Sequence, residues 1–546
     1  MRGLTRKRWV AGAVGLTIAM VGLTACGSDS NTPAAAGTVS IFGCKPQNPL
    51  IPSNTNEVCG GNVMDAVFTG LVNYNPDTAK PENAVATSIE STDNTTWTIK
   101  LNDKYTFADG TKVTAESFVN AWNWSAYGPN AQNNSYFFAN IAGYDALNPA
   151  DPDDNPDTKN TPKPKTDKMT GLTVVSPTEF TVKLTSPASS YPVQLGYTAF
   201  APLPASFYAD TVAFGKKPVG NGPFKITSGS PDKGFTLEAV DGYVGPDKPK
   251  VKTVQFKTYQ NPGAAYADMQ GNNLDFMDQV PDAALVNDGY QKDFPGRFVN
   301  KPVGVIQTAT LPLYDANFKN DPNVAKALSL AIDRDAITKK VFNGGRTPAT
   351  GWVSPVVEGY KAGACGEFCT YDPAKAKEFL AKAKFKGPFT FATNSDGPGN
   401  VTAATAICNS IKNALGVGCN PKVYVDFSTL RTDVGDKKMT SMFRTGWQMD
   451  YPSMENFLAP LYVTDASAND GSYSNKEFDS LITKAAGENG DASLATYQQA
   501  EALLSNDMSI IPLWYQAQQS IWSTKVDNVK VTPFSTLDLS SITLKG

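Results

Sequence analysis

The sequence predicts an α/β protein built from several lobes, one of them rich in β-structure. With 546 residues, 41% of them apolar, the chain exceeds one ordinary domain and favours roughly two to four lobes. Residues 389–427 alternate strand, helix and strand (FTFATN, TAATAICNSIKNALGV, PKVYVDF), which is typical of an α/β lobe. An earlier block of alternating apolar and polar residues supplies the β-rich part.

The N-terminus predicts export. Four basic residues within the first eight precede an apolar stretch of about 14 residues, too short for a spanning helix. Leu23-Thr24-Ala25-Cys26 resembles the bacterial lipoprotein box, whose cysteine is lipidated. We therefore expect a signal peptide over 1–25, and a lipidated Cys26 with a flexible tether over 26–37, on the outer face of the cytoplasmic membrane. An ordinary signal peptide with an incidental cysteine is the alternative.

Composition excludes several classes of function. The pI is near 5.3, which argues against a nucleic-acid partner. The chain has no histidine, which excludes Ser-His-Asp and Cys-His nucleophiles as well as His-ligated zinc or copper. Glycoside hydrolysis by a pair of carboxylates stays open. We expect no cofactor and no metal.

Six cysteines remain after Cys26, an even number that suggests disulfides in an exported protein. Zinc is the alternative, which an oxidising compartment and the absence of histidine oppose. Proximity along the chain favours the pairs Cys44–Cys59, Cys365–Cys369 and Cys408–Cys419.

Local patterns predict the elements of the first half in order. Thr114 is placed to cap the helix that follows it, and Glu116 lies near the positive end of that helix. Strands are expected where apolar and polar residues alternate. The expected elements are a strand at 38–42, a polar loop at 45–62, a helix at 63–72, a strand at 95–103, a helix at 115–124, a hairpin at 172–187 and a strand entered through the Gly-Pro turn at 218–226.

In the second half of the chain, Asp-Pro pairs mark the predicted starts of helices. Asp321 and Pro322 begin a helix that Asn343-Gly344-Gly345 ends, so one helix is expected over 321–345. A second Asp-Pro start predicts a helix over 372–385. Residues 509–523 are expected to form a pair of strands.

The order of these segments resembles the solute-binding proteins of peptide ABC importers, the oligopeptide- and dipeptide-binding family (extracellular solute-binding protein family 5). The likeness covers nearly the whole mature chain. The matching segments are NPLIPSNTNEVCGGNVMDAVFTGLVNYNP, WTIKLNDKYTFADGTKVTAESFVNAW, GNGPF, NVAKALSLAIDRDAI, YDPAKAKEFLAKA, GWQMDYPSMENFLAP, YSNKEFDSLITKA and SIIPLWY.

The resemblance implies a two-lobed clamp of the type II periplasmic-binding-protein kind, with an extra β-rich subdomain inserted in lobe I. Ligand would close the lobes about two chain crossings, near 303–307 and 509–512. The implied division is lobe I at 38–75, 195–302 and 510–546, the inserted subdomain at 76–194, and lobe II at 303–509.

The resemblance also implies a ligand site in the segment GWQMD. In this family the motif G-W-x-x-D holds the α-ammonium of a peptide, which points here to Gly446, Trp447 and Asp450. Aromatic walls from Trp447 and Tyr451 would exclude water and add cation–π attraction. Arg444 would serve the carboxylate end of the peptide. Alternatively, Asp450 is a turn residue and Trp447 is core.

Four further ligand contacts are expected. Asn54 and Glu57 belong to a loop that faces the cleft in the family, while Tyr314 and Trp514 follow the two crossings. A turn residue at Asn54 and core positions for Tyr314 and Trp514 are the alternatives.

The expected function is a non-enzymatic, monomeric receptor that binds oligopeptides and delivers them to ABC permease subunits, held to the membrane by its lipid anchor. One alternative is a binder of the same fold for an oligosaccharide or an amino-acid conjugate. Another is a secreted glycosidase, and a third is a sensor that hands signal peptides onward.

Overall fold

The computed structural model describes residues 37–150, 162–395, 399–466 and 468–545. The expected signal peptide and the expected lipidation site at Cys26 lie outside the described residues. Among the residues described, none of the helices combines the length and the apolar character needed to cross a bilayer.

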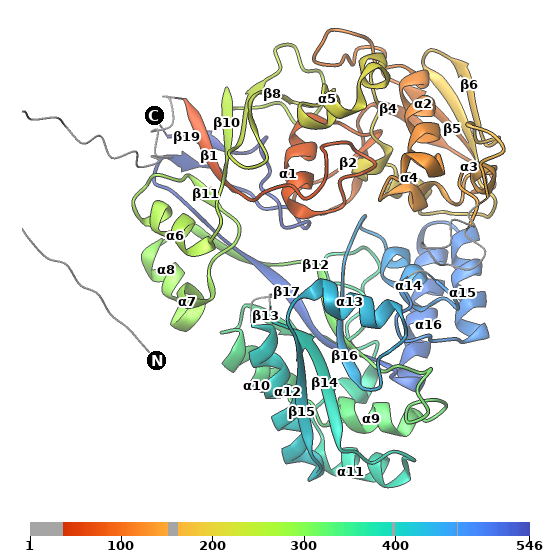
Figure 1. Ribbon diagram of the computed structural model, residues 1–546, viewed down its shortest axis with the longest axis vertical. Helices are drawn as coiled ribbons and strands as arrows, with labels where there is room; N and C mark the ends of the chain where they lie inside the picture. The colour runs from red at the N-terminus through yellow and green to blue at the C-terminus, as the bar shows by residue number, and fades with distance from the viewer. Residues whose placement is uncertain (1–36, 151–161, 396–398, 467, 546) are drawn as a thin grey trace, which may run out of the picture.

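A single eleven-stranded sheet runs through both lobes (Figure 1). Its order is β15-β14-β16-β12-β17-β11-β1-β10-β9-β8, and β13 pairs with β17. The strands are β1 (Thr38–Gly43), β8 (Phe224–Ser230), β9 (Gly234–Ala239), β10 (Thr253–Thr258), β11 (Phe276–Met277), β12 (Phe298–Thr310), β13 (Arg346–Pro348), β14 (Phe389–Asn394), β15 (Cys419–Tyr424), β16 (Met442–Gln448) and β17 (Ile510–Trp522). The predicted α/β class is confirmed.

Strands β12 and β17 carry the chain between the lobes. They pair antiparallel from Phe298↔Ile521 in the first lobe to Thr310↔Ile510 in the second. The register shifts between Pro302 and Ile306, where the partner on β17 changes from Ala517 to Tyr515. The expected crossing at 303–307 coincides with this irregularity.

Strand β17 has two irregularities in its pairing with β12. Ile510, Ile511, Leu513 and Tyr515 pack in the core of the second lobe, and a second register shift, between Gln307 and Thr308, changes the partner from Trp514 to Pro512 at the end of the expected crossing. The strand pair expected over 509–523 is wrong, because one continuous strand reaches from the second lobe into the first.

The first lobe surrounds the β1 side of the sheet. Its further elements are α1 (Val58–Val67), β2 (Val72–Tyr74), α5 (Thr211–Lys216), α6 (Pro262–Gln270), α7 (Asp282–Leu285), α8 (Gly289–Asp293), β18 (Val526–Asp527) and β19 (Thr543–Leu544). Helix α1 begins five residues before the predicted start at 63. The reason is that the Glu57 side chain accepts from the N–H of Gly60 and caps the helix there.

The β-rich segment forms a four-stranded sheet of order β4-β5-β7-β6. Its elements are β3 (Pro81–Asn83), β4 (Ala86–Glu90), β5 (Thr96–Leu101), α2 (Ala115–Ala126), α3 (Tyr144–Leu147), β6 (Leu172–Ser176), β7 (Glu179–Lys183) and α4 (Tyr191–Gln194). The predicted strand at 95–103 and hairpin at 172–187 are confirmed. The core of this segment is continuous with the first lobe: the indole N–H of Trp122 donates to the carbonyl of Phe200 at 3.0 Å.

The second lobe surrounds the β14–β15–β16 part of the sheet. Its helices are α9 (Pro322–Leu330), α10 (Arg334–Val341), α11 (Pro373–Lys382), α12 (Asn400–Leu415), α13 (Phe427–Gly435), α14 (Met454–Tyr462), α15 (Lys476–Gly487) and α16 (Gly490–Asp507). Helix α12 connects the parallel strands β14 and β15, which confirms the predicted strand–helix–strand unit. The single helix predicted over 321–345 is wrong. The chain breaks after Leu330, and Asp333 caps a second helix by accepting from the N–H of Ala336.

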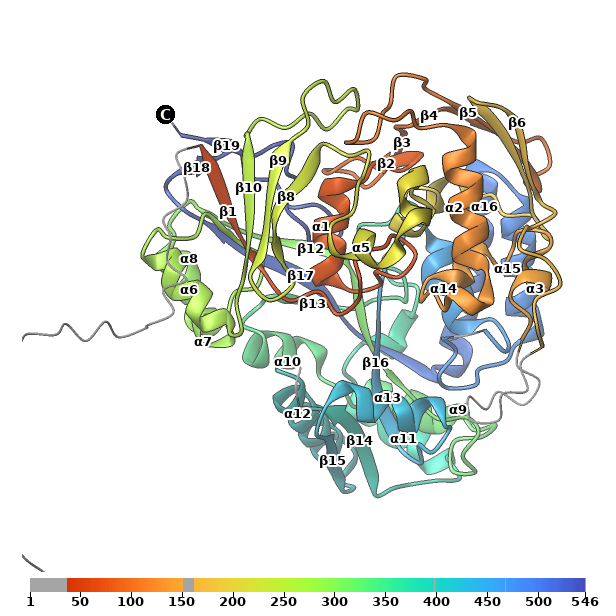
Figure 2. The ribbon, with the colours of Figure 1, turned by 45° about the horizontal axis from the view of Figure 1, so that its top comes forward.

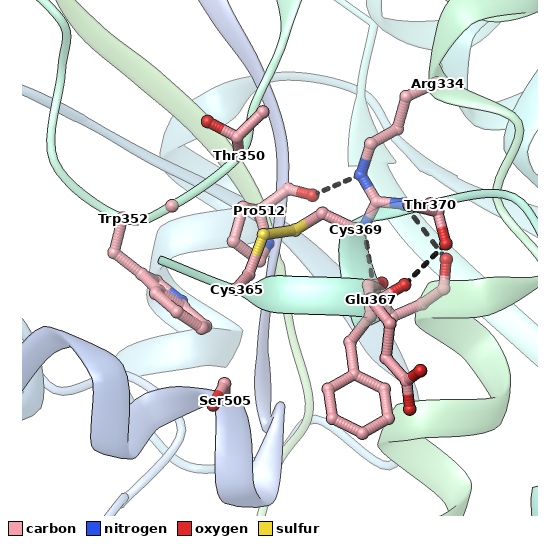
Figure 3. The surroundings of a disulfide bond; sticks show 12 residues. Arg334, Thr350, Trp352, Cys365, Glu367, Cys369, Thr370, Ser505 and Pro512 are labelled. Carbon is pink, nitrogen blue, oxygen red and sulfur yellow. Dashed lines mark hydrogen bonds between the residues drawn. A yellow bond between two sulfur atoms is a disulfide. The ribbon is translucent and has the colours of Figure 1, made fainter. Parts of the chain in front are cut away.

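Within the described residues, three disulfides join cysteines that are neighbours along the chain. Cys44–Cys59 fixes the loop after β1 to the first turn of α1, and Cys408–Cys419 joins α12 to β15. Figure 3 shows Cys365–Cys369 near Arg334, whose Nε donates to the carbonyl of Pro512 in β17 at 2.7 Å.

Candidate ligand-binding site

A cavity of about 1660 Å³ lies between the two lobes. It forms where the parallel strands of each lobe end, the position at which open α/β sheets bind ligands. Its walls include Gly43 and Cys44 at the end of β1, Thr258 and Asn261 after β10, Asp278 and Gln279 after β11, Ser395 after β14, Phe427 after β15, and Arg444–Gln448 of β16. The volume exceeds that of a typical pocket for a drug-sized molecule.

Three of the predicted site residues line this cavity: Arg444, Gly446 and Trp447. All three lie on β16, which pairs with the crossing strand β12. A Cβ at Gly446 would lie 2.5 Å from Nε2 of Gln307 and 2.8 Å from the carbonyl of Ile306. Glycine is therefore needed there for β16 to approach β12 closely.

Asp450 follows β16, lies outside the cavity lining and is held by Asn456 of α14. The amide of Asp450 donates to Oδ1 of Asn456 at 2.9 Å, and Nδ2 of Asn456 donates to the Asp450 carboxylate at 3.1 Å. The indole N–H of Trp447 donates to the same Oδ1 at 3.1 Å. Asn456 is buried, and thus one asparagine fixes both Trp447 and Asp450, the two side chains that the motif predicts as ligand contacts. The motif G-W-x-x-D does not point to Asn456.

Burial raises the pKa of Asp450 to about 6, while the hydrogen bond from Asn456 lowers it and the neighbouring Glu455 adds to the rise. The Asp450 carboxylate in turn acts on tyrosines of the other lobe. Burial and then Asp450 raise the pKa of Tyr74, Tyr136 and Tyr197. Asp450 therefore lies close enough to these tyrosines of the other lobe to act on their hydroxyl groups electrostatically.

The second-lobe wall carries arginines. Nη1 of Arg444 donates to Oδ1 of Asn394 at 3.3 Å. Arg431 forms a bidentate ion pair with Asp470, with Nη1–Oδ2 at 2.5 Å and Nη2–Oδ1 at 3.0 Å. The Arg346 guanidinium lies 3.6 Å from the centroid of the Phe342 ring. Such groups suit carboxylates of a ligand. Arg431 and Arg346 were not predicted.

Tyr451 and Glu57 have structural roles. Tyr451 is buried and its hydroxyl donates to Glu455 at 2.6 Å, within the start of α14. Glu57 caps α1, accepting from Gly60 at 2.9 Å. Neither residue lines the cavity. A capping carboxylate and a ligand carboxylate look alike in a sequence, because both precede a helix or turn.

Asn54, Tyr314 and Trp514 also lie outside the cavity lining. The backbone and side chain of Asn54 accept from Asn133, which joins the loop to the β-rich segment. Tyr314 packs against the small cluster around α13. Trp514 is buried, and its ring lies 5.0 Å from that of Phe342, so it supports the residue on which Arg346 rests.

Within the described residues, no three Cys, Asp or Glu side chains are grouped so that they could hold a metal ion. What the fold and cavity define is a two-lobed binding protein with its ligand site between the lobes.

Comparison with known families identifies the class more closely. The family model "Bacterial extracellular solute-binding proteins, family 5 Middle" matches residues 80–469. The chain belongs to this family.

Two curated relatives come from Bacillus subtilis (strain 168). The oligopeptide-binding protein OppA is 26% identical, with 93% of this chain and 94% of that protein covered. The dipeptide-binding protein DppE is 27% identical, with 98% of each covered.

Solved structures share the fold over nearly the full length. The murein tripeptide binding protein MppA of Escherichia coli superimposes with a TM-score of 0.74 at 22% identity, covering 94% of this chain and 99% of that one. OppA of Haemophilus influenzae, in complex with RPPGFSPFR, gives 0.73 at 21% identity, with 94% and 100% covered.

Proposed function

We propose that the protein is a lipid-anchored, monomeric receptor on the outer face of the cytoplasmic membrane. It binds oligopeptides between its lobes and delivers them to an ABC permease, and it acts as a binder and not as an enzyme. The proposal is supported by membership of the solute-binding family and by relatives named for oligopeptides and dipeptides. The size of the cavity suits an extended peptide.

The environment of Asp450 is the observation that carries the proposal. Its carboxylate is partly buried, and no Lys or Arg within the described part of the chain forms an ion pair with it. Asn456 holds it in place, and tyrosines of the other lobe face it. A fixed, desolvated carboxylate beside aromatic rings suits an ammonium group, such as the free N-terminus of a peptide. Sugars supply no such cation.

Mass spectrometry of the ligand extracted from the purified protein tests this function. We expect a mixture of short peptides with free amino termini. Extraction of sugars, or of peptides with blocked amino termini, would overturn the proposal and favour a binder of another solute.

The anchor is tested separately with Cys26→Ala. Because a diacylated cysteine holds a protein firmly, the substitution should release the protein from washed membranes into the soluble fraction. Ser28→Ala is the matched control and should stay with the membrane. Retention of the Cys26→Ala protein after a salt wash would contradict the anchor.

A further inference from the structure

The first-lobe wall of the cavity is mostly apolar and carries one charge. Many of its residues are hydrophobic. They come from β1, α1, β9, β10 and the segment from β11 to just after α7, and they are Phe42, Val58, Val63, Phe235, Phe256, Val280, Leu285 and Val286. Of the described residues that the first lobe contributes to this wall, Asp278 is the charged one.

Asp278 directly follows β11, beside the crossing strand β17. Its main-chain carbonyl accepts from Nε2 of Gln518, which fixes the backbone at this point. No side chain of the described residues forms an ion pair with its carboxylate. Burial raises the pKa of Asp278 to about 7. This carboxylate is thus desolvated at the cavity wall without a cation from the protein to compensate it, which is costly unless a ligand supplies one.

The other charges of the cavity do not compete for a cation. Arg346, Arg431 and Arg444 all come from the second lobe, and Asp470 is engaged by Arg431 through both carboxylate oxygens. Ligand carboxylates are therefore drawn to the second-lobe wall, and a ligand cation that approaches the first-lobe wall meets Asp278.

We propose that Asp278 binds the cationic side chain of a lysine or arginine in the bound peptide, so that the protein selects peptides with a basic residue at one position. This inference rests on the proposed function and names its preferred substrates. Lysine and arginine match the wall because their aliphatic stems pack on apolar surface while their charged ends need an acceptor. The α-ammonium of the peptide is served separately, by Asp450 on the second lobe.

Calorimetry with pairs of alanine-based pentapeptides tests the inference. The two peptides of a pair differ at one position, which holds lysine in one peptide and the neutral, similarly shaped norleucine in the other. From pair to pair, this position moves along the peptide, beginning after the N-terminal residue. At one position the wild-type protein should bind the lysine peptide roughly 10- to 100-fold more tightly, the range of a charged hydrogen bond. Asp278→Asn keeps the shape of the side chain and should abolish that preference while binding the norleucine peptide as before.

Asp450→Asn is the matched control. It should weaken the lysine and norleucine peptides equally and leave their ratio unchanged. Equal binding of lysine and norleucine peptides by the wild type at every position, or a lysine preference that survives Asp278→Asn, would overturn the inference while leaving peptide binding intact. If no peptide binds the wild type at all, the proposed function fails and the inference falls with it.

Discussion

At the scale of single residues, Asn456 organises the segment that carries the proposed ammonium site. Its side chain makes hydrogen bonds to the Trp447 indole, to the Asp450 amide and to the Asp450 carboxylate. Asn456→Ala removes all three hydrogen bonds and releases the segment that carries Asp450, although Asn456 itself lines no part of the cavity.

We expect Asn456→Ala to weaken peptide binding roughly tenfold, the effect of losing one or two net hydrogen bonds that position the site. Calorimetry with a neutral peptide measures the change. The comparison variant is Asn394→Ala, which removes the side chain that accepts a hydrogen bond from Arg444 and leaves Asn456 in place. An unchanged affinity in Asn456→Ala would remove the positioning role.

The pKa of Asp450 gives a pH prediction. In the free protein this pKa is about 6, raised by burial. A bound ammonium favours the ionised carboxylate, so the pKa falls on binding and affinity for the peptide increases as pH rises through about 6. Below that value the affinity should fall by up to about tenfold per pH unit.

The measurement is a series of binding isotherms between pH 5 and 7.5, with a peptide that has no basic side chain so that Asp278 does not contribute. Asp450→Asn should flatten the profile. The same slope in the mutant would assign the titration to another group.

How far the sequence predicts the site depends on the residue. Arg444, Gly446 and Trp447 were predicted from one motif, and they line the cavity because they share strand β16. Asp278 and Asn456 were not predicted. Asn456 acts through hydrogen bonds to Trp447 and Asp450 that depend on how the chain turns between β16 and α14. Asp278 is distinguished by the absence of a cationic partner within the described residues, which a single sequence does not show.

At the scale of elements, the predictions succeeded where the local signal was complete. The strand–helix–strand unit around α12 and the hairpin β6–β7 follow from periodicity and turns alone. The helix over 321–345 failed because the side chain of Asp333 caps α10 and so begins a second helix inside the predicted span. The pair of strands predicted over 509–523 failed because β17 continues from one lobe into the other with its glutamines at the cavity, an arrangement that only the tertiary structure shows.

The disulfide between α12 and β15 gives a prediction at this scale. Cys408–Cys419 closes a loop with a separation of 11 residues, and Cys365–Cys369 one with a separation of 4. Loop-closure entropy gives about 2.8 kcal/mol of stabilisation for the first and about 1.9 kcal/mol for the second.

Replacing both cysteines of the α12–β15 pair with alanine should therefore lower the melting temperature more than the same change at the shorter loop. Differential scanning calorimetry of the two double mutants checks this order. The reverse order would show that local packing, and not loop closure, sets the contribution.

At the scale of the whole molecule, the lobes meet both at the crossing strands and at the β-rich segment, which lies over α15 and α16 (Figure 2). The amide of Ser189 donates to the carbonyl of Ala486 at 2.8 Å, and Ser190 donates to Glu455 at 3.4 Å. Glu455 accepts from Tyr451 and neighbours Asn456, so the lobe contact adjoins the segment that holds Asp450. The contact between the lobes and the side chain that holds Asp450 therefore both involve α14.

The central claim is that Asp450 binds the free amino terminus of a peptide between closed lobes. The most direct measurement is calorimetry on four combinations: wild type and Asp450→Ala, each with a free and an N-acetylated form of one peptide. Either single change removes one partner of a buried ion pair, which costs about 3–5 kcal/mol and lowers affinity by roughly two to three orders of magnitude. The two losses should not add, because they delete the same interaction. Equal affinity of the wild-type protein for the free and acetylated peptides would contradict the account.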